Sequence, residues 1–480
     1  MRFVPFVGRS KELSKLRALY SKRSASLVVV RGRRRIGKSR LVEEFAKDYT
    51  FIQFAGLAPT KGVTQQSQRD VFAQQLSAQL NLPKIQSQNW SELFSLLARS
   101  TQKGRIVVLL DEISWMGSKD PTFLGKLKNA WDIEFKKNPD LILILCGSVS
   151  TWIEKNIISS TAFFGRISLY ITLEELPLYD CHELFLQQGF RGTLHEEFKL
   201  LSVMGGIPWY LEQINPKFNA DENIKQLCFT KEGLLFNEFD KIFHDLFQKK
   251  GDLYKKIALI LSEGDCDFNT ICQKLNYAKS GIISTYLDNL VQSGFVSRDY
   301  TWLIKTGKNS RLSVFRLSDN YLRFYLKYIL PNSPKIIAEN FSDISLAQLS
   351  GWSSLMGFQF ENLVLKNRKI IKKLLNITPQ DIVSDNPFFQ RKSSAHQGCQ
   401  IDYLIQTRFN TLFACEIKFS QNEITSGVIQ EMKSKIARLV LPKGFSCFPV
   451  LIHANGVSEE VEDSGYFVEC IDFSKLLIFD

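Results

Sequence analysis

The chain has 480 residues, of which 44% are apolar and 23% charged, and its formal net charge is +12. This length is too great for one ordinary hydrophobic core, so roughly two to four domains are expected. The proportions of apolar and charged residues are those of a soluble globular protein. The positive charge favours an anionic partner, and nucleic acid, nucleotide and an acidic membrane surface fit it equally well.

Nine cysteines are scattered along the chain without a C-x-x-C pair. This distribution argues against a disulfide framework and against a zinc site, and reduced thiols favour a cytoplasmic protein. The first residues lack the apolar core of a signal peptide. No stretch approaches roughly 18 uncharged apolar residues, so we expect no membrane-spanning segment and no membrane partner.

Residues 26–48 have the pattern of a buried strand, a loop and an amphipathic helix that starts near Arg40. The loop matches the P-loop pattern G-x-x-x-x-G-K-[ST]. Its residues are Gly32, Arg33, Arg34, Arg35, Ile36, Gly37, Lys38 and Ser39.

The residue types of this loop suit the binding of ATP with Mg²⁺. The two glycines allow backbone N–H groups to turn towards phosphate oxygens, and the helix N-terminus adds further donors. We expect Lys38 to reach the β- and γ-phosphates and the Ser39 hydroxyl to bind Mg²⁺. The three arginines either add positive charge near the phosphates or point into solvent.

Two further apolar segments end in polar residues that fit the same site. Residues 105–110 lead into Asp111 and Glu112, the pattern of a Walker B strand. We expect Asp111 to hold the Mg²⁺ shell and Glu112 to orient or deprotonate the attacking water. Residues 141–147 lead into Ser148, which either positions that water or only caps the next helix.

The following segment contains less specific candidates. Arg166 follows Phe-Phe-Gly, and it is a candidate for sensing the γ-phosphate, for serving a neighbouring subunit as an arginine finger, or for a surface salt bridge. Residues 179–188 and 196–203 are predicted to be helices of a small lid. The turn at 204–207 then leads into a helix that starts near Pro208.

Three helices, at 253–261, 267–275 and 280–293, precede two short strands around a polar tip, the pattern of a winged helix-turn-helix. Such a module either binds DNA or packs only within its own chain, and both interpretations stay open. A prolyl segment at 331–334 is predicted to be a linker. The candidates for phosphate contact are Lys279, Ser280, Ser284, Thr285, Lys305, Lys308 and Arg311.

The last part of the chain carries a second set of ionisable residues. Glu361 lies in a predicted helix, Asp402 in a predicted strand, and Glu416 and Lys418 in the next strand. Residues two apart on a strand point to the same face, so Glu416 and Lys418 can share a site with Asp402. The three carboxylates would bind Mg²⁺ and Lys418 would stabilise a hydroxide, or all four form a salt-bridged sheet face.

The order of these motifs resembles the archaeal-type ATPase family, which is related to signal-transducing ATPases and origin-recognition initiators. The resemblance covers residues 1 to about 235 and rests on Val-Gly-Arg at 7–9, the P-loop, Leu-Leu-Asp-Glu, Cys-Gly-Ser, Phe-Gly-Arg and Gly-Gly-Ile-Pro. It implies that Val7 and Gly8 lie over the adenine ring and that Pro208 lies near the base. The layout around Glu361, Asp402 and Glu416 resembles a restriction-endonuclease-like core.

These observations predict an α/β protein with four parts. The parts are an AAA+-like P-loop ATPase core at 1–175, a helical lid at 176–245, a winged helix-turn-helix at 246–330 and a restriction-endonuclease-like domain at 335–480. The leading hypothesis is an ATPase that acts on nucleic acid, with DNA favoured, and that assembles with further copies if Arg166 is a finger. The alternative is a nucleotide-dependent switch or scaffold whose last domain only docks a partner.

Overall fold

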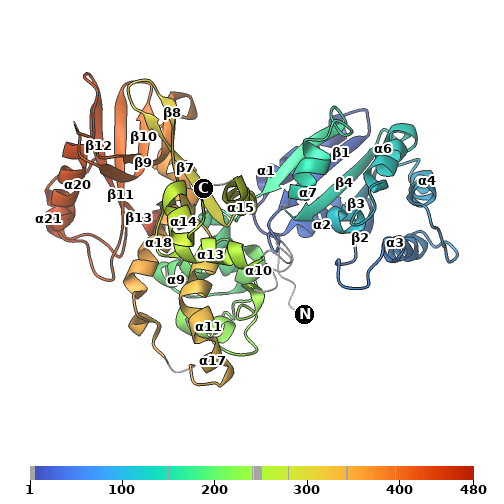
Figure 1. The fold of residues 1–480 in the computed structure, drawn as a ribbon, viewed down its shortest axis with the longest axis horizontal. Coiled ribbons are helices and arrows are strands. Elements are labelled where there is room, and N and C mark those ends of the chain that lie inside the picture. The colour runs from blue at the N-terminus through green and yellow to red at the C-terminus, as the bar shows by residue number, and fades with distance from the viewer. Residues whose placement is uncertain are drawn as a thin grey trace. The chain divides into compact units, whose positions relative to one another are not determined.

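The computed structural model describes residues 6–148, 151–239, 242, 251–278, 281–341, 344–394 and 396–479. The chain divides into two compact units, one of residues 6–175 and one that starts at Leu176 and continues to the end of the chain (Figure 1). In the part of the chain that is described, no helix is both long and apolar enough to cross a membrane.

The first unit contains a five-stranded sheet with the order β2-β3-β4-β1-β5, in which every neighbouring pair is parallel. The three central strands, β1, β3 and β4, are almost wholly buried, which suits apolar segments covered on both faces, whereas the edge strands β2 and β5 are partly exposed. They are β1 (Ser26–Gly32), β2 (Thr50–Ala55), β3 (Ile106–Asp111), β4 (Leu141–Ser148) and β5 (Ile167–Leu173).

The strand order positions the predicted nucleotide site. β4 lies between β1 and β3, and Gly32 is in register with Ser148 at one edge of the sheet. On the other side of β4, Leu110 is in register with Leu145. The carboxyl ends of β1, β3 and β4 therefore lie side by side, where ligands bind in open parallel sheets.

Helices cover both faces of this sheet (Figure 1). One face packs on α3, α4 and α6 through a core in which Trp90 contacts the rings of Phe94 and Phe123. Val28 and Val30 alternate with the β1 residues of that core, so they face the opposite side. The helices are α1 (Ser10–Arg17), α2 (Lys38–Ala46), α3 (Gln65–Gln79), α4 (Trp90–Ser100), α5 (Ile113–Met116), α6 (Phe123–Ile133) and α7 (Thr151–Ile153).

The second unit begins with helices at the place of the predicted lid and continues through three helices and an antiparallel sheet of order β6-β8-β7. Lys279 and Ser280 lie outside the described residues, as does most of the segment from 240 to 250. The elements are α8 (Leu178–Gln188), α9 (Leu194–Met204), α10 (Pro208–Leu211), α11 (Ala220–Cys228), α13 (Gly251–Ser262), β6 (Cys266–Asp267), α14 (Phe268–Leu275), α15 (Gly281–Gln292), β7 (Val296–Leu303) and β8 (Lys308–Leu317).

A second five-stranded sheet, of order β13-β12-β11-β10-β9, forms the C-terminal part of this unit. β9, β10 and β11 are antiparallel, whereas β11, β12 and β13 are parallel. The strands are β9 (Ile382–Gln390), β10 (Cys399–Thr407), β11 (Thr411–Phe419), β12 (Ser446–Ala454) and β13 (Glu469–Asp472). The helices around them are α18 (Trp352–Lys366), α19 (Arg368–Leu374), α20 (Gly427–Arg438), α21 (Glu459–Asp463) and α22 (Phe473–Ile478).

The β7–β8 ribbon packs against the C-terminal sheet (Figure 1). Trp302 and Ile304 belong to the same buried cluster as Leu404 of β10 and Met432 of α20. The Trp302 indole Nε1 donates to Gln406 Oε1 at 2.6 Å, and Gln406 Nε2 donates to the Ile304 carbonyl at 2.8 Å. The body of the ribbon therefore packs within its own chain. The basic side chains at its tip, those of Lys305, Lys308 and Arg311, are exposed to solvent.

The predicted linker at 331–334 is wrong, because this segment is helical. Pro331 and Pro334 lie in α17 (Leu330–Ile337), which continues directly from a π-helical turn at Tyr325–Ile329. Pro331 is the second residue of α17 and Pro334 lies inside it, so both prolines belong to one helical segment that runs without a break from Asn320 to Ile337. The prolines therefore do not mark a flexible boundary between two domains.

The ribbon contact can be tested through Gln406. Gln406→Leu leaves the buried Trp302 N–H without its acceptor, so the free energy of unfolding of this unit should fall by about 1–3 kcal/mol. Gln400→Leu, on an exposed position of the same strand, is the matched control. Urea unfolding followed by tryptophan fluorescence measures both, and equal effects would show that the buried pair contributes nothing specific.

Candidate functional site

The loop from Gly32 to Ser39 connects β1 to α2 at the carboxyl edge of the first sheet. A Cβ atom at position 32 would lie 2.8 Å from Ile36 Cγ2 and 2.9 Å from the Leu173 carbonyl oxygen, so only glycine fits there. Gly37 has φ +86° and Arg35 has φ 70°, both in the left-handed region. Successive N–H groups in such a turn point into one concavity, which is the arrangement that binds anions.

Lys38 and Ser39 stand at the start of α2. Lys38 is buried, and its Nζ donates to the carbonyl oxygens of Gly32 at 3.2 Å and Arg33 at 3.1 Å. The Ser39 hydroxyl donates to Asp111 Oδ2 at 2.5 Å, which joins the P-loop to the end of β3. The Lys38 ammonium group is therefore hydrogen-bonded to two neutral carbonyls of the loop itself, inside the concavity that phosphates would fill.

Glu112 follows β3 with φ 51°, and its backbone N–H donates to Asp111 Oδ1 at 2.9 Å. The Ser148 hydroxyl lies 3.5 Å from Glu112 Oε1. Glu112 Oε2 is buried and has no hydrogen-bond partner among the described residues. Burial raises the pKa of the Glu112 carboxyl, while the positive charges of Lys38 and Arg34 oppose this rise.

The residues at this edge fit Mg²⁺ and a nucleotide. A hydroxyl and a carboxylate oxygen at Ser39 and Asp111 are the oxygen ligands that Mg²⁺ prefers. The buried Glu112 Oε2 is a free acceptor for a water molecule. Arg34 is close enough to Glu112 to lower its pKa, so at least one of the three loop arginines contributes charge here. Arg33 is buried, whereas Arg40 lies on α2 beside Glu43.

Arg9 is a residue that the sequence interpretation did not assign. Its guanidinium Nη2 donates to the Ile36 carbonyl at 3.2 Å and to the Glu174 carbonyl at 2.6 Å. Gly8 and Arg9 both have positive φ, and α1 starts directly after them. Arg9 thus ties the Val7–Gly8 segment to the P-loop, and the Val-Gly-Arg motif was the signal for it.

Arg166 does not belong to this edge of the sheet. It precedes β5, and Ile167 is in register with Leu27 at the amino end of β1. At about 3.3 Å per residue, the P-loop lies roughly 20 Å further along the strands. Arg166 instead forms two 2.9 Å contacts with Asp132, whose pKa they lower to about 2. The prediction that Arg166 senses phosphate within its own chain is wrong; the role towards a neighbouring subunit stays a prediction.

Pro208 is the first residue of α10 in the second unit, as the sequence predicted for a helix start. Its approach to a nucleotide base stays a prediction. The same holds for the contact of Val7 and Gly8 with adenine.

The acidic residues of the C-terminal sheet are close to one another. Asp402 lies on β10, and Glu416 on β11 is almost fully buried. Glu361 on α18 is partly buried, and desolvation together with the Asp402 charge raises the pKa of Glu361 to about 8. Lys418 Nζ lies 3.4 Å from Glu416 Oε1 and 2.5 Å from Glu431 Oε2.

Lys435 of α20 is the second residue that the sequence interpretation missed. Its Nζ donates to Glu416 Oε2 and lies 3.5 Å from Asp402 Oδ1. Asp402 Oδ2 accepts from the Ile417 N–H at 2.9 Å. Among the described residues no group of three or more histidines, cysteines and carboxylates is arranged to hold a metal ion. In this arrangement protein ammonium groups contact the carboxylates of Asp402 and Glu416. The binding of Mg²⁺ by Glu361, Asp402 and Glu416 stays a prediction.

Comparison with known proteins agrees with the first site. Residues 6–214 match a family described as an ATPase domain predominantly from Archaea. The chain is 25% identical over 360 residues to an uncharacterized protein of Methanocaldococcus jannaschii. The matched region covers 75% of this chain and 76% of that protein.

Solved structures with a similar fold include a Walker-type ATPase of Pyrococcus abyssi. It is 17% identical, with a TM-score of 0.50, and the match covers 67% of this chain and 96% of that one. The ORC2 protein of Aeropyrum pernix, in its ADPNP and ADP complexes, gives 15% identity and a TM-score of 0.44 over 70% of this chain and 96% of that one.

A parallel sheet with a P-loop after β1 and an Asp-Glu pair after β3 defines the class of P-loop ATPases. Within that class, residues 6–214 match the family of ATPase domains found predominantly in Archaea.

The role of Arg9 can be tested by Arg9→Lys. Lysine has a shorter reach than arginine and lacks its planar set of fixed donors, so the loop should be less well ordered and ATP affinity should fall by roughly tenfold. Arg17→Lys, on an exposed position of α1, is the matched control. Calorimetric titration with ATP measures both variants, and unchanged affinity in Arg9→Lys would mean that the loop keeps its shape without this contact.

Proposed function

We propose that this chain binds and hydrolyses ATP with Mg²⁺ at the carboxyl edge of the first sheet, and that nucleotide turnover serves an action on nucleic acid. The observation that carries the first half is the convergence of Lys38, Ser39, Asp111 and Glu112 at the ends of adjacent elements. The family match of residues 6–214 supports the same conclusion.

Each residue has a distinct part in the proposed hydrolysis. Lys38 exchanges its two carbonyl acceptors for phosphate oxygens, which are stronger acceptors because they are charged. Ser39 and Asp111 hold the Mg²⁺ shell. When bound, Mg²⁺ neutralises negative charge on the phosphate oxygens. Glu112 orients the attacking water and accepts its proton, with Ser148 beside it, and the raised pKa of Glu112 suits a general base.

The proposed action on nucleic acid rests on the net charge of +12 and on where basic residues are exposed. The tip of the β7–β8 ribbon exposes Lys305, in the turn, and Lys308 and Arg311, at the start of β8, to solvent. The body of the ribbon is fixed by Trp302 and Gln406, so this tip is held on a rigid base. Fixed, exposed cations are well placed to contact phosphates, and DNA is the partner that the proposal names first.

A specific observation favours the second candidate, a nucleotide-dependent switch or scaffold with an inactive C-terminal docking domain. Glu361, Asp402, Glu416 and Lys418 lie together, yet the carboxylates of Asp402 and Glu416 are engaged by protein cations. Mg²⁺-dependent cleavage by this set stays a prediction, and incubation of the whole chain with plasmid and branched DNA, with and without ATP, tests it.

The nucleotide site is tested by two substitutions. Lys38→Ala should nearly abolish ATP binding, because the phosphates lose a buried cation. Glu112→Gln should keep binding and lower the hydrolysis rate by roughly a hundredfold or more, as expected for loss of a general base. Asp140→Asn, an exposed carboxylate before the amino end of β4, is the control. Wild-type turnover in both variants would refute the assignment.

The nucleic-acid interface is tested through salt dependence. Replacing Lys305, Lys308 and Arg311 together by Ala should weaken DNA binding and reduce the slope of log affinity against log salt by up to about 3. Replacing exposed Lys103, Lys136 and Lys137 by Ala removes the same charge elsewhere and should leave the slope nearly unchanged. A flat salt response in the wild type, or no binding at low salt, would favour the scaffold.

A further inference from the structure

All four carboxylate oxygens of Asp402 and Glu416 have a partner from the protein itself. Asp402 Oδ2 accepts from the Ile417 N–H, and Asp402 Oδ1 lies 3.5 Å from Lys435 Nζ. Glu416 Oε2 accepts from Lys435, and Glu416 Oε1 lies 3.4 Å from Lys418 Nζ. Both carboxylates are thus contacted by protein ammonium groups without any added ion, although Lys418 also pairs with Glu431.

Lys435 takes the position between the two carboxylates. It projects from α20, whose Val428 and Met432 fix that helix on the sheet face through the buried core. The side chain of Glu416 is only 2% exposed, whereas that of Lys435 is 22% exposed. The buried carboxylate therefore needs a cation, and the cation that satisfies it still has a path to solvent.

We propose that the Lys435 ammonium is the resident cation of this acidic site, and that a divalent metal ion binds Asp402 and Glu416 only by displacing it. Two cations between the same pair of carboxylates repel each other strongly at such short range. The wild-type chain therefore holds metal weakly at this site. The inference goes beyond the proposed nucleotide chemistry and does not depend on it, because it concerns a site in the second unit.

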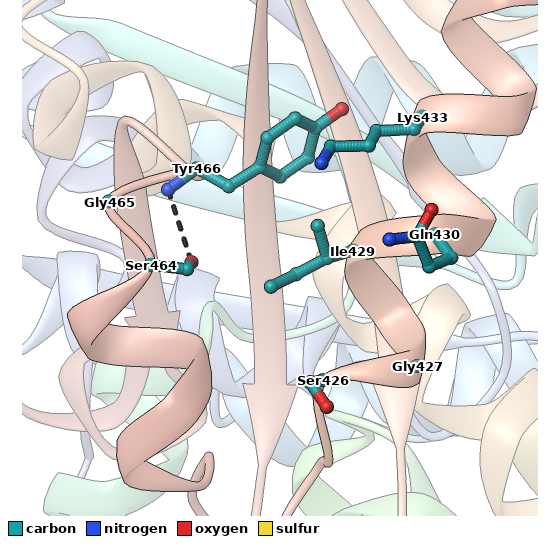
Figure 2. Close-up of a pocket in the computed structure, with 8 residues that line it drawn as sticks. All are labelled: Ser426, Gly427, Ile429, Gln430, Lys433, Ser464, Gly465 and Tyr466. Atoms are coloured by element: carbon teal, nitrogen blue, oxygen red, sulfur yellow. Dashed lines mark hydrogen bonds between the residues drawn. The ribbon is translucent and has the colours of Figure 1, made fainter.

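α20 itself provides a matched control. Lys433 stands two residues from Lys435, which on a helix turns its side chain to nearly the opposite side. Its Nζ lies 5.3 Å from the centroid of the Tyr466 ring, at a cavity of about 650 Å³ (Figure 2). Lys433→Met thus removes the same charge from the same helix without touching Asp402 or Glu416.

The test is calorimetric titration of nucleotide-free, full-length protein with Mn²⁺, together with its heat-unfolding transition. Lys435→Met should bind Mn²⁺ at least roughly tenfold more tightly than the wild type, because the competing cation is gone. Lys433→Met should bind like the wild type. The double variant Asp402→Asn with Lys435→Met should lose the gain, which assigns the bound ion to this site and not to the P-loop.

Several results would overturn the inference. The proposed displacement of Lys435 by the metal ion is contradicted if the wild type binds Mn²⁺ as tightly as Lys435→Met does. It is also contradicted if Lys435→Met binds Mn²⁺ more weakly than the wild type. An equal gain in Lys433→Met would show a general charge effect. If Lys435→Met does not fold, Lys435→Gln replaces it with the same comparison, because its amide still donates to Glu416 without a charge. ATP turnover is measured in parallel, so failure of the proposed ATPase is recognised separately.

Discussion

The first unit depends on one constraint, which is that its three central parallel strands, β1, β3 and β4, are buried on both faces. Polar side chains cannot stand along such strands without partners, so they are confined to the strand ends. The order β2-β3-β4-β1-β5 then brings the ends of β1, β3 and β4 together. Lys38, Asp111 and Ser148 are far apart in the sequence and meet only because of this order.

Two lysines of this chain are held in different ways, and the difference explains what each site is ready to bind. Lys38 donates to two neutral backbone carbonyls, which a charged phosphate oxygen replaces at little cost. Lys435 lies between two carboxylates, which hold an ammonium group much more strongly. The first arrangement is open to an anion, and the second is already satisfied by the protein.

The second unit joins elements that the sequence divides into separate domains. Arg316 of β8 donates to Asp299 of β7 at 2.9 Å, and Asn362 of α18 donates to the Leu317 carbonyl at 2.9 Å. All these side chains are buried, so the ribbon and the helix that carries Glu361 are fixed to each other. The tip of the β7–β8 ribbon and the acidic site of Glu361, Asp402 and Glu416 therefore belong to one rigid part of the second unit.

The sequence by itself determined the nucleotide site, because its chemistry is local. A P-loop needs glycines, a lysine and a hydroxyl at fixed spacing, and the Asp111–Glu112 pair directly follows an apolar strand. The helices and strands around Glu361, Asp402 and Glu416 were predicted for a similar reason, since strong periodicity marks buried elements. The predicted linker at 331–334 failed because both prolines lie within a continuous helical segment, whereas proline in a sequence favours a break.

Only the tertiary structure decided which distant groups meet. Arg9 reaches Ile36 and Glu174 across the fold, and Lys435 reaches Asp402 and Glu416 from a helix that carries no recognisable motif. Arg166 was placed wrongly for the same reason, because its distance from the P-loop depends on strand direction and register. Long side chains pair according to how elements pack, and sequence spacing contains little information about packing between elements.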